Sequence, residues 1–207
     1  MGVSRKNVLQ LNQNRNLVKG DKHMFTREKM QEAEVSIRVA MFYIKRQLTK
    51  EDIVVSIDGA HIKTGETVHF DINSFTSKIG MIKVDGQYDR WQGTYEVEGY
   101  DTRITIHSQP GMGDILIKQL NGKMLNIESK KGNLCKTSKT TEYALMREAI
   151  GQLMTSENCT NNTDLAVAVP KSDKSYELAS RWSKLEQIKA VNIKFLLVEE
   201  SGDIVFL

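Results

Sequence analysis

The residues best able to do chemistry lie around one predicted β-hairpin. Asp114 comes directly before one apolar run, and Glu128 and Lys130 lie at the end of the next run along the chain. The dipeptide Asn121-Gly122 separates the two runs and is among the strongest short-range signals for a hairpin turn. The spacing therefore predicts two carboxylates and one ammonium group on neighbouring strands.

The register of this hairpin decides whether the three groups meet. A two-residue loop would mix apolar and polar side chains on both faces of the ribbon. A three-residue loop that pairs Ile117 with Ile127 leaves one face apolar. On the other face it puts Asp114 opposite Lys130 and diagonal to Glu128. The hydrophobic pattern thus favours the register that gathers these groups.

Two carboxylates on one side of a sheet repel each other unless a cation lies between them. A hard divalent ion with oxygen ligands meets that need, and Lys130 would add a second positive charge. The alternative is a simple cross-strand ion pair between Asp114 and Lys130 on a solvated face. Both interpretations fit the hairpin taken alone.

A helix predicted to begin at Thr26 supplies a further carboxylate. Its apolar seam is formed by Met30, Ile37, Met41, Ile44 and Leu48. The spacing leaves one position of that seam for Glu34, whereas Glu32 lies about 160° away around the helix and is expected to face solvent. A carboxylate in a core-facing seam should be paired or bind a metal, unless Glu34 lies at an exposed end and reaches water.

The other expected elements follow from periodicity and turn residues. We expect strands at 53–57, 67–72, 79–84, 91–98, 102–107, 114–120, 124–129, 165–169, 193–198 and 204–207, and helices at about 140–154 and 175–190. This order predicts an α/β fold with a mixed central sheet flanked by helices on both faces. Residues 1–25 are expected to form a basic, flexible arm, and residues 26–207 a single domain with a β-rich insertion at about 52–101.

Pro110, Asp114 and Glu128-Ser129-Lys130 on a hairpin, preceded by a helix carrying Glu34, resemble the PD-(D/E)xK nuclease superfamily. The resemblance covers roughly residues 26–50 and 102–207. Three glycine or methionine residues separate Pro110 from Asp114, so the proline carries little information. The resemblance implies a restriction-endonuclease-like core of order αβββαβ, and a nuclease, most often a DNA endonuclease, that depends on Mg²⁺ with Mn²⁺ as a substitute.

The same resemblance implies roles for individual residues. Asp114, Glu128 and the backbone carbonyl of Ser129 would hold the metal, and Glu34 would complete the site through a metal-bound water or a second ion. Lys130 would orient or help deprotonate the attacking water and stabilise developing charge. The helix at 142–154 is similar to the helix that follows the catalytic hairpin in many members.

Basic residues near the hairpin suggest a polyanionic partner. Residues 1–50 carry a balance of +7 and residues 118–139 a balance of +5 in a chain of net charge +3. Cations gathered on one surface gain from counterion release when they meet phosphates, although solvated faces kept charged for solubility are the alternative. The candidate phosphate contacts are Lys131, Lys136, Lys139 and Arg147. Gln152 is expected to be a buried amide that orients Glu128 or Lys130.

The acidic insertion holds six of the 14 aromatic residues, namely Phe70, Phe75, Tyr88, Trp91, Tyr95 and Tyr100. They could stack on bases, but filling a small core or a contact in a homodimer is the stronger expectation. Two further functions stay open: a nucleic-acid or protein-binding module without hydrolysis, and a nuclease subunit of a larger assembly.

Composition limits the class of protein. The chain has 207 residues, of which 40% are hydrophobic and 27% charged, as in ordinary globular proteins. No apolar run reaches the roughly 18 residues of a membrane helix, and no apolar core of a signal peptide follows Met1. Cys135 and Cys159 form neither a disulfide framework nor a zinc knuckle. The expected location is therefore the cytoplasm, without membrane contact.

Overall fold

The computed structural model describes residues 28–109, 113–135, 141–157 and 159–207. Four features of the sequence analysis lie outside these residues: the arm at 1–25, the helix start at Thr26, Pro110, and the pair Lys136 and Lys139. Within the described residues no helix is both long and apolar enough to span a membrane.

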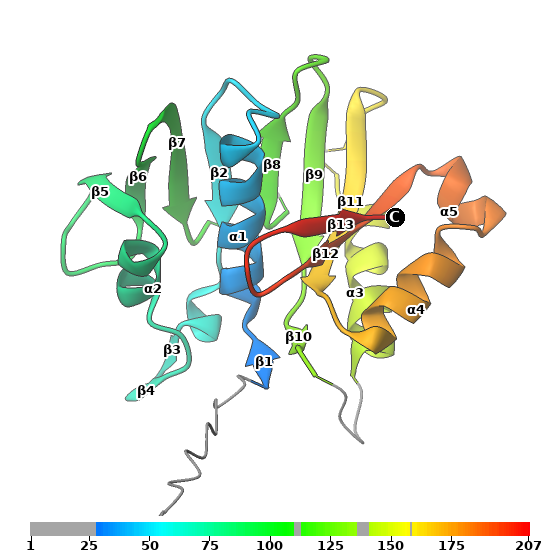
Figure 1. Cartoon of the computed structure of the whole chain (residues 1–207), viewed down its shortest axis with the longest axis horizontal. Helices are drawn as coiled ribbons and strands as arrows, with labels where there is room; N and C mark the ends of the chain where they lie inside the picture. Colours follow the sequence, from blue (N-terminus) through cyan, green and yellow to red (C-terminus); the bar gives the residue numbers. More distant parts are fainter. Residues whose placement is uncertain (1–27, 110–112, 136–140, 158) are drawn as a thin grey trace, which may run out of the picture.

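Nine strands form one mixed sheet, whose order from one edge to the other is β13-β12-β11-β9-β8-β2-β7-β6-β5 (Figure 1). The strands are β2 (Ile53–Ser56), β5 (Met81–Asp85), β6 (Gly93–Val97), β7 (Tyr100–His107), β8 (Ile115–Lys118), β9 (Met124–Ser129), β11 (Thr163–Pro170), β12 (Ile193–Val198) and β13 (Ile204–Phe206). Strands β2, β8 and β9 are antiparallel neighbours, and β11 runs parallel to β9. The mixed sheet predicted from the element order is therefore confirmed.

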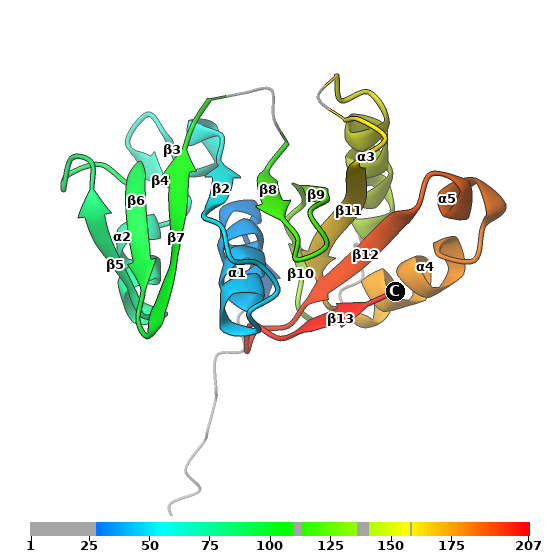
Figure 2. The same cartoon turned by 90° about the horizontal axis from the view of Figure 1, so that it is seen from above.

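Helices cover both faces of this sheet (Figure 2). They are α1 (Glu32–Lys45), α2 (Ile72–Lys78), α3 (Glu142–Met154), α4 (Asp173–Trp182) and α5 (Glu186–Ala190), with a short 3₁₀ turn η1 (Gly59–His61). Helix α1 packs in the core that contains Ile115 and Ile127, and α3 and α4 pack in a second core with Val167 and Phe195. Two small ribbons complete the fold: β1 (Lys29–Met30) with β10 (Gly132–Asn133), and β3 (Lys63–Thr64) with β4 (Thr67–Val68).

The central hairpin forms with a different register from the expected one. Ile115 pairs with Ile127 and Ile117 with Leu125, so the predicted pairing of Ile117 with Ile127 is wrong. The loop does have three residues, 120–122, and Gly122 takes the last of them with a φ of 82°. Glycine adopts this left-handed conformation without strain, so Gly122 takes the last position of the loop. The loop therefore lies one residue earlier in the sequence than predicted. The shift of two positions leaves each side chain on its predicted face.

The β-rich segment at 52–101 does not form a separate layer. Its strand β2 lies between β8 and β7, so the segment extends the central sheet towards the β5 edge. Tyr95 and Phe70 are buried in the main core, as the packing interpretation predicts, whereas the Tyr88 side chain is 84% exposed. The segment and the hairpin therefore share one hydrophobic core.

Two helices differ from the sequence-based expectation. The strand expected at 67–72 ends at Val68, and α2 begins at Ile72, where the Asp71 carboxylate accepts a hydrogen bond from the Ser74 amide at 3.0 Å. This N-cap fixes a helix too short to show periodicity. The helix expected at 175–190 divides into α4 and α5, which are separated by residues 183–185.

Candidate active site

Four of the predicted site residues, Asp114, Glu128, Ser129 and Lys130, converge where β8 begins and β9 ends. The Ser129 amide donates a hydrogen bond of 2.7 Å to Oδ2 of Asp114, and Lys130 Nζ donates one of 2.9 Å to Oε1 of Glu128. The observed register, continued by one residue, puts Asp114 opposite Glu128. Lys130 pairs with Glu128, so the alternative prediction of an Asp114–Lys130 ion pair is wrong.

These groups are buried to an unusual degree for charged residues. Glu128 is 7% exposed and Lys130 4%, and Ser129 is fully buried. Charged residues are rarely buried so deeply unless they are paired or serve a site. The chain folds this way locally because the apolar face of the hairpin, with Ile127 and Leu125, packs under α1 and turns the polar face towards α3.

Helix α3 provides one wall of the site. Its Glu148 carboxylate lies 3.5 Å from Lys130 Nζ. A hollow of about 340 Å³ between the sheet and the last turn of α3 is lined by Glu128, Asn126 and Gln152, among other residues. Gln152 is exposed in this hollow, so its prediction as a buried amide is wrong, because Ala149 and Leu153 occupy the packing side of the helix.

Helix α1 brings a different carboxylate to the site from the predicted one. Glu34 is fully buried, but it accepts a hydrogen bond of 2.9 Å from Arg38 Nε one turn along the helix. Glu32, expected in solvent, has a side chain only 12% exposed and lies 3.2 Å from His61 Nδ1. Glu32 is also the α1 carboxylate that acts electrostatically on Asp114 and Lys130.

The physical reason is that α1 has more than one buried face. Ten of its 14 residues are buried, so a single apolar seam does not identify the side that faces the hairpin. The helix starts at Glu32, later than predicted, and its first residue lies where the chain leaves the β1–β10 ribbon. A carboxylate at a helix N-terminus is also favoured by the helix dipole. Glu34 lies in the same first turn, so the helix dipole does not distinguish the two carboxylates and no local signal identifies Glu32.

The pKa values of Asp114, Glu128 and Lys130 are all raised, as expected where carboxyl groups outnumber cations. Burial, and then the neighbouring Glu128 carboxylate, raise the pKa of Asp114 from 3.8 to about 8. Burial raises the pKa of Glu128 as well, despite the opposing effect of Lys130. Burial alone would lower the pKa of Lys130, but Glu32 and Glu128 outweigh it and the pKa is raised. Lys130 is therefore a firmly charged ammonium group among carboxyls that are costly to ionise.

The donor set suits a hard divalent cation. Four carboxyl groups, those of Glu32, Asp114, Glu128 and Glu148, influence or contact the one ammonium group of Lys130. A divalent ion held by oxygen ligands would offset this excess and favour ionised carboxylates. Within the described ranges, the structure contains no group of three or more His, Cys, Asp or Glu side chains close enough together to coordinate a metal ion.

The predicted phosphate contacts that the structure describes are accessible. Lys131 is exposed immediately after the buried Lys130. Arg147 is exposed on α3, where its guanidinium lies 5.4 Å from the centre of the Tyr143 ring. Both side chains are therefore accessible to a polyanion.

Comparisons with known proteins identify no relative. No family model, curated protein or solved structure matches this chain. The case for a function rests on the residues and geometry described above.

Proposed function

We propose that this protein is a Mg²⁺-dependent nuclease that hydrolyses phosphodiester bonds of nucleic acid, with DNA as the expected substrate. The observation that supports it best is the meeting of Asp114, Glu128 and Lys130 at the ends of two adjacent strands. Buried ionisable groups with perturbed pKa values beside a hollow are typical of catalytic sites.

The order of elements around these residues supports the same proposal. Helix α1, the antiparallel neighbours β2, β8 and β9, helix α3 and the parallel strand β11 follow one another along the chain. This order resembles a restriction-endonuclease-like core, although its first strand is then β2, from the segment at 52–101 that was expected to be an insertion, in place of the expected strand at 102–107. The strands β5 to β7 would then be an elaboration of one edge of that core.

Each residue has a chemical role in this proposal. Asp114, Glu128 and, by resemblance, the Ser129 carbonyl would hold Mg²⁺, and Glu32 would take the role that was predicted for Glu34. The bound ion would neutralise phosphate charge and lower the pKa of a bound water. Lys130 would orient that water and stabilise charge on the phosphate, since its ammonium group is already fixed between two carboxylates.

Exposed cationic residues would position the substrate. Lys131 and Arg147 are exposed, and contacts from such cations to phosphates fix the register of nucleic acid without reading its sequence. Such contacts also require that binding weaken as the salt concentration rises.

The test is an incubation of supercoiled, linear and single-stranded DNA, and of RNA, with the protein and either Mg²⁺ or EDTA. The protein is expected to cleave in Mg²⁺ and not in EDTA, and Asp114→Asn should reduce the cleavage rate at least a hundredfold. Asp101→Asn, at an exposed position on β7, is the matched control and should cleave at the parent rate. Parent-level cleavage by the Asp114 variant would exclude the proposed site.

A non-catalytic function has one specific observation in its favour, which is the direct ion pair between Lys130 and Glu128. In that case the pair would be structural and the fold would bind nucleic acid or a protein without hydrolysis. Salt-sensitive DNA binding by the well-folded parent protein, with no cleavage of any substrate in Mg²⁺ or Mn²⁺, would favour this function.

A further inference from the structure

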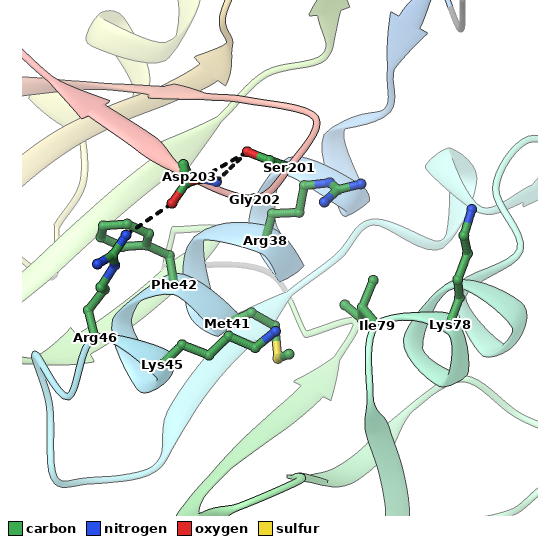
Figure 3. Close-up of a pocket in the computed structure, with 10 residues that line it drawn as sticks. All are labelled: Arg38, Met41, Phe42, Lys45, Arg46, Lys78, Ile79, Ser201, Gly202 and Asp203. Atoms are coloured by element: carbon green, nitrogen blue, oxygen red, sulfur yellow. Dashed lines mark hydrogen bonds and ion pairs between the residues drawn. The ribbon is translucent and has the colours of Figure 1, made fainter. Parts of the chain in front are cut away.

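A second pocket, of about 570 Å³, lies on the side of α1 away from the sheet. It is bounded by α1, by the end of α2 and by the turn between β12 and β13 (Figure 3). Among the residues that the structure describes, its lining carries four cationic side chains, those of Arg38, Lys45, Arg46 and Lys78, and one carboxylate, that of Asp203; the buried Glu34 pairs with Arg38 from behind the lining. None of these residues belongs to the candidate active site.

Arg38 is held in place before any ligand arrives. Its side chain is only 13% exposed, its Nε donates a hydrogen bond to the buried Glu34, and its guanidinium lies 5.2 Å from the centre of the Phe75 ring. A Cβ added at Gly202 would lie 3.6 Å from Nη1, so the other end of the guanidinium borders the pocket at the β12–β13 turn. A fixed guanidinium loses little entropy when it binds an oxyanion.

The other cations are available to a ligand. Lys45 and Lys78 are exposed, and neither forms an ion pair with another residue of the described ranges. Arg46 does contact Asp203, at 3.1 Å, but both side chains are about 60% exposed. Such an exposed pair contributes little and can rearrange. The pocket therefore presents more positive charge than its own carboxylate can balance.

The floor of the pocket is apolar. Met41 and Ile79 face each other across it, whereas the Phe42 ring lies beside Arg46, whose guanidinium is 5.6 Å from the ring centre (Figure 3). A bare inorganic anion would leave this apolar surface without a partner. A ligand with a flat, weakly polar part joined to a phosphate would use both the floor and the cationic rim.

We propose that this pocket binds a nucleotide, with its phosphate among the cationic side chains of Lys45, Lys78 and Arg38 and its base against Met41 and Ile79. The nucleotide could be free or part of a strand, because the phosphate and the base are the same in both. The site is separate from the Asp114 hairpin, so the inference does not depend on nuclease activity.

The test measures binding by calorimetry with four probes: AMP, adenosine, inorganic phosphate and a short single-stranded oligonucleotide. AMP should bind more tightly than adenosine, which lacks the phosphate, and more tightly than phosphate, which lacks the base. Replacing both Lys45 and Lys78 by Gln should weaken AMP about a hundredfold, since each charged contact is worth about tenfold. Lys174→Gln with Lys189→Gln, at exposed positions on α4 and α5, is the charge-matched control.

Asp114→Asn should bind AMP as the parent does, which separates this pocket from the proposed active site. If the parent binds AMP and the Lys45/Lys78 variant binds it more weakly, the ligand is a free nucleotide. If only the oligonucleotide binds in this lysine-dependent way, the ligand is a nucleic-acid strand. The inference is overturned if the Lys45/Lys78 variant binds every probe as the control does, or if adenosine binds as well as AMP.

Discussion

The raised pKa of Asp114 makes a quantitative prediction about stability. The group titrates near pH 3.8 in the unfolded chain and near 8 in the folded protein. Below pH 4 both states hold the proton, and the Asp114 carboxyl has little influence on stability. Between pH 4 and 8 only the unfolded state releases it, so the free energy of unfolding falls as the pH rises.

Asp114→Asn removes this penalty and keeps an oxygen that can accept the hydrogen bond from the Ser129 amide. The difference between pH 3.8 and 8 corresponds to on the order of 5 kcal/mol. In EDTA the variant should therefore match the parent near pH 4, exceed its stability by roughly 3 kcal/mol at pH 6, and exceed it most at pH 8. Urea unfolding at these three pH values measures the difference.

Asp164 provides the control of opposite sign. A hydrogen bond from Gln119, with Lys194 and Lys123 nearby, lowers the pKa of the Asp164 carboxyl. Its ionised form stabilises the fold above the unfolded-state pKa, and this contribution is lost as the pH falls through the folded-state value. Asp164→Asn should therefore destabilise the protein at pH 7 and not at low pH.

Mg²⁺ should raise the free energy of unfolding of the parent protein and leave that of Asp114→Asn unchanged. An ion that binds only the folded state at a hundred times its dissociation constant stabilises it by about 2.7 kcal/mol. At pH 8 this gain is expected for the parent and should be absent from Asp114→Asn. A variant that is less stable than the parent at pH 8 in EDTA, or a difference between the two that does not change with pH, would contradict the raised pKa of Asp114.

Three further predictions concern the proposed nuclease. Lys130→Ala should lower the cleavage rate at least a hundredfold. Lys118→Ala, at an exposed position of the same hairpin, should leave the rate unchanged. Equal rates for the two variants would contradict the role of Lys130. Glu32→Gln should weaken Mg²⁺ binding measured by calorimetry, and Glu51→Gln, an exposed carboxylate paired with Lys118, should not. DNA affinity should fall steeply with salt, and Lys131→Gln should lower the log–log slope by about 0.7 to 0.9; a slope near zero would argue for a protein partner.

The sequence alone determined the elements whose signals are local. The Asn121-Gly122 dipeptide predicted the hairpin, and alternation along the two strands put Ile115 and Ile127 on one face and Glu128 on the other. These features survive a change of register by two positions, because the side-chain period of a strand is two. Asp114, Glu128 and Lys130 could therefore be predicted to meet before the fold was known.

The pairing partner of each residue was decided by tertiary structure. The position of Gly122 in the loop moved the register, so that Asp114 lies opposite Glu128 and not Lys130, and Lys130 pairs with Glu128 two residues before it in the same segment. The segment at 52–101 contains strands that periodicity can find, but only the shared core shows that they extend the same sheet.

The choice between Glu32 and Glu34 depends on packing and not on any local pattern. Helical periodicity identifies an apolar seam, and it predicts Glu34 to be buried, as it is. Helix α1, however, is surrounded on several sides, so burial does not specify which neighbour a side chain meets. Arg38 from the next turn pairs with Glu34, while the end of the helix carries Glu32 towards the hairpin. Distances between elements far apart in the sequence depend on packing, and no local pattern encodes them.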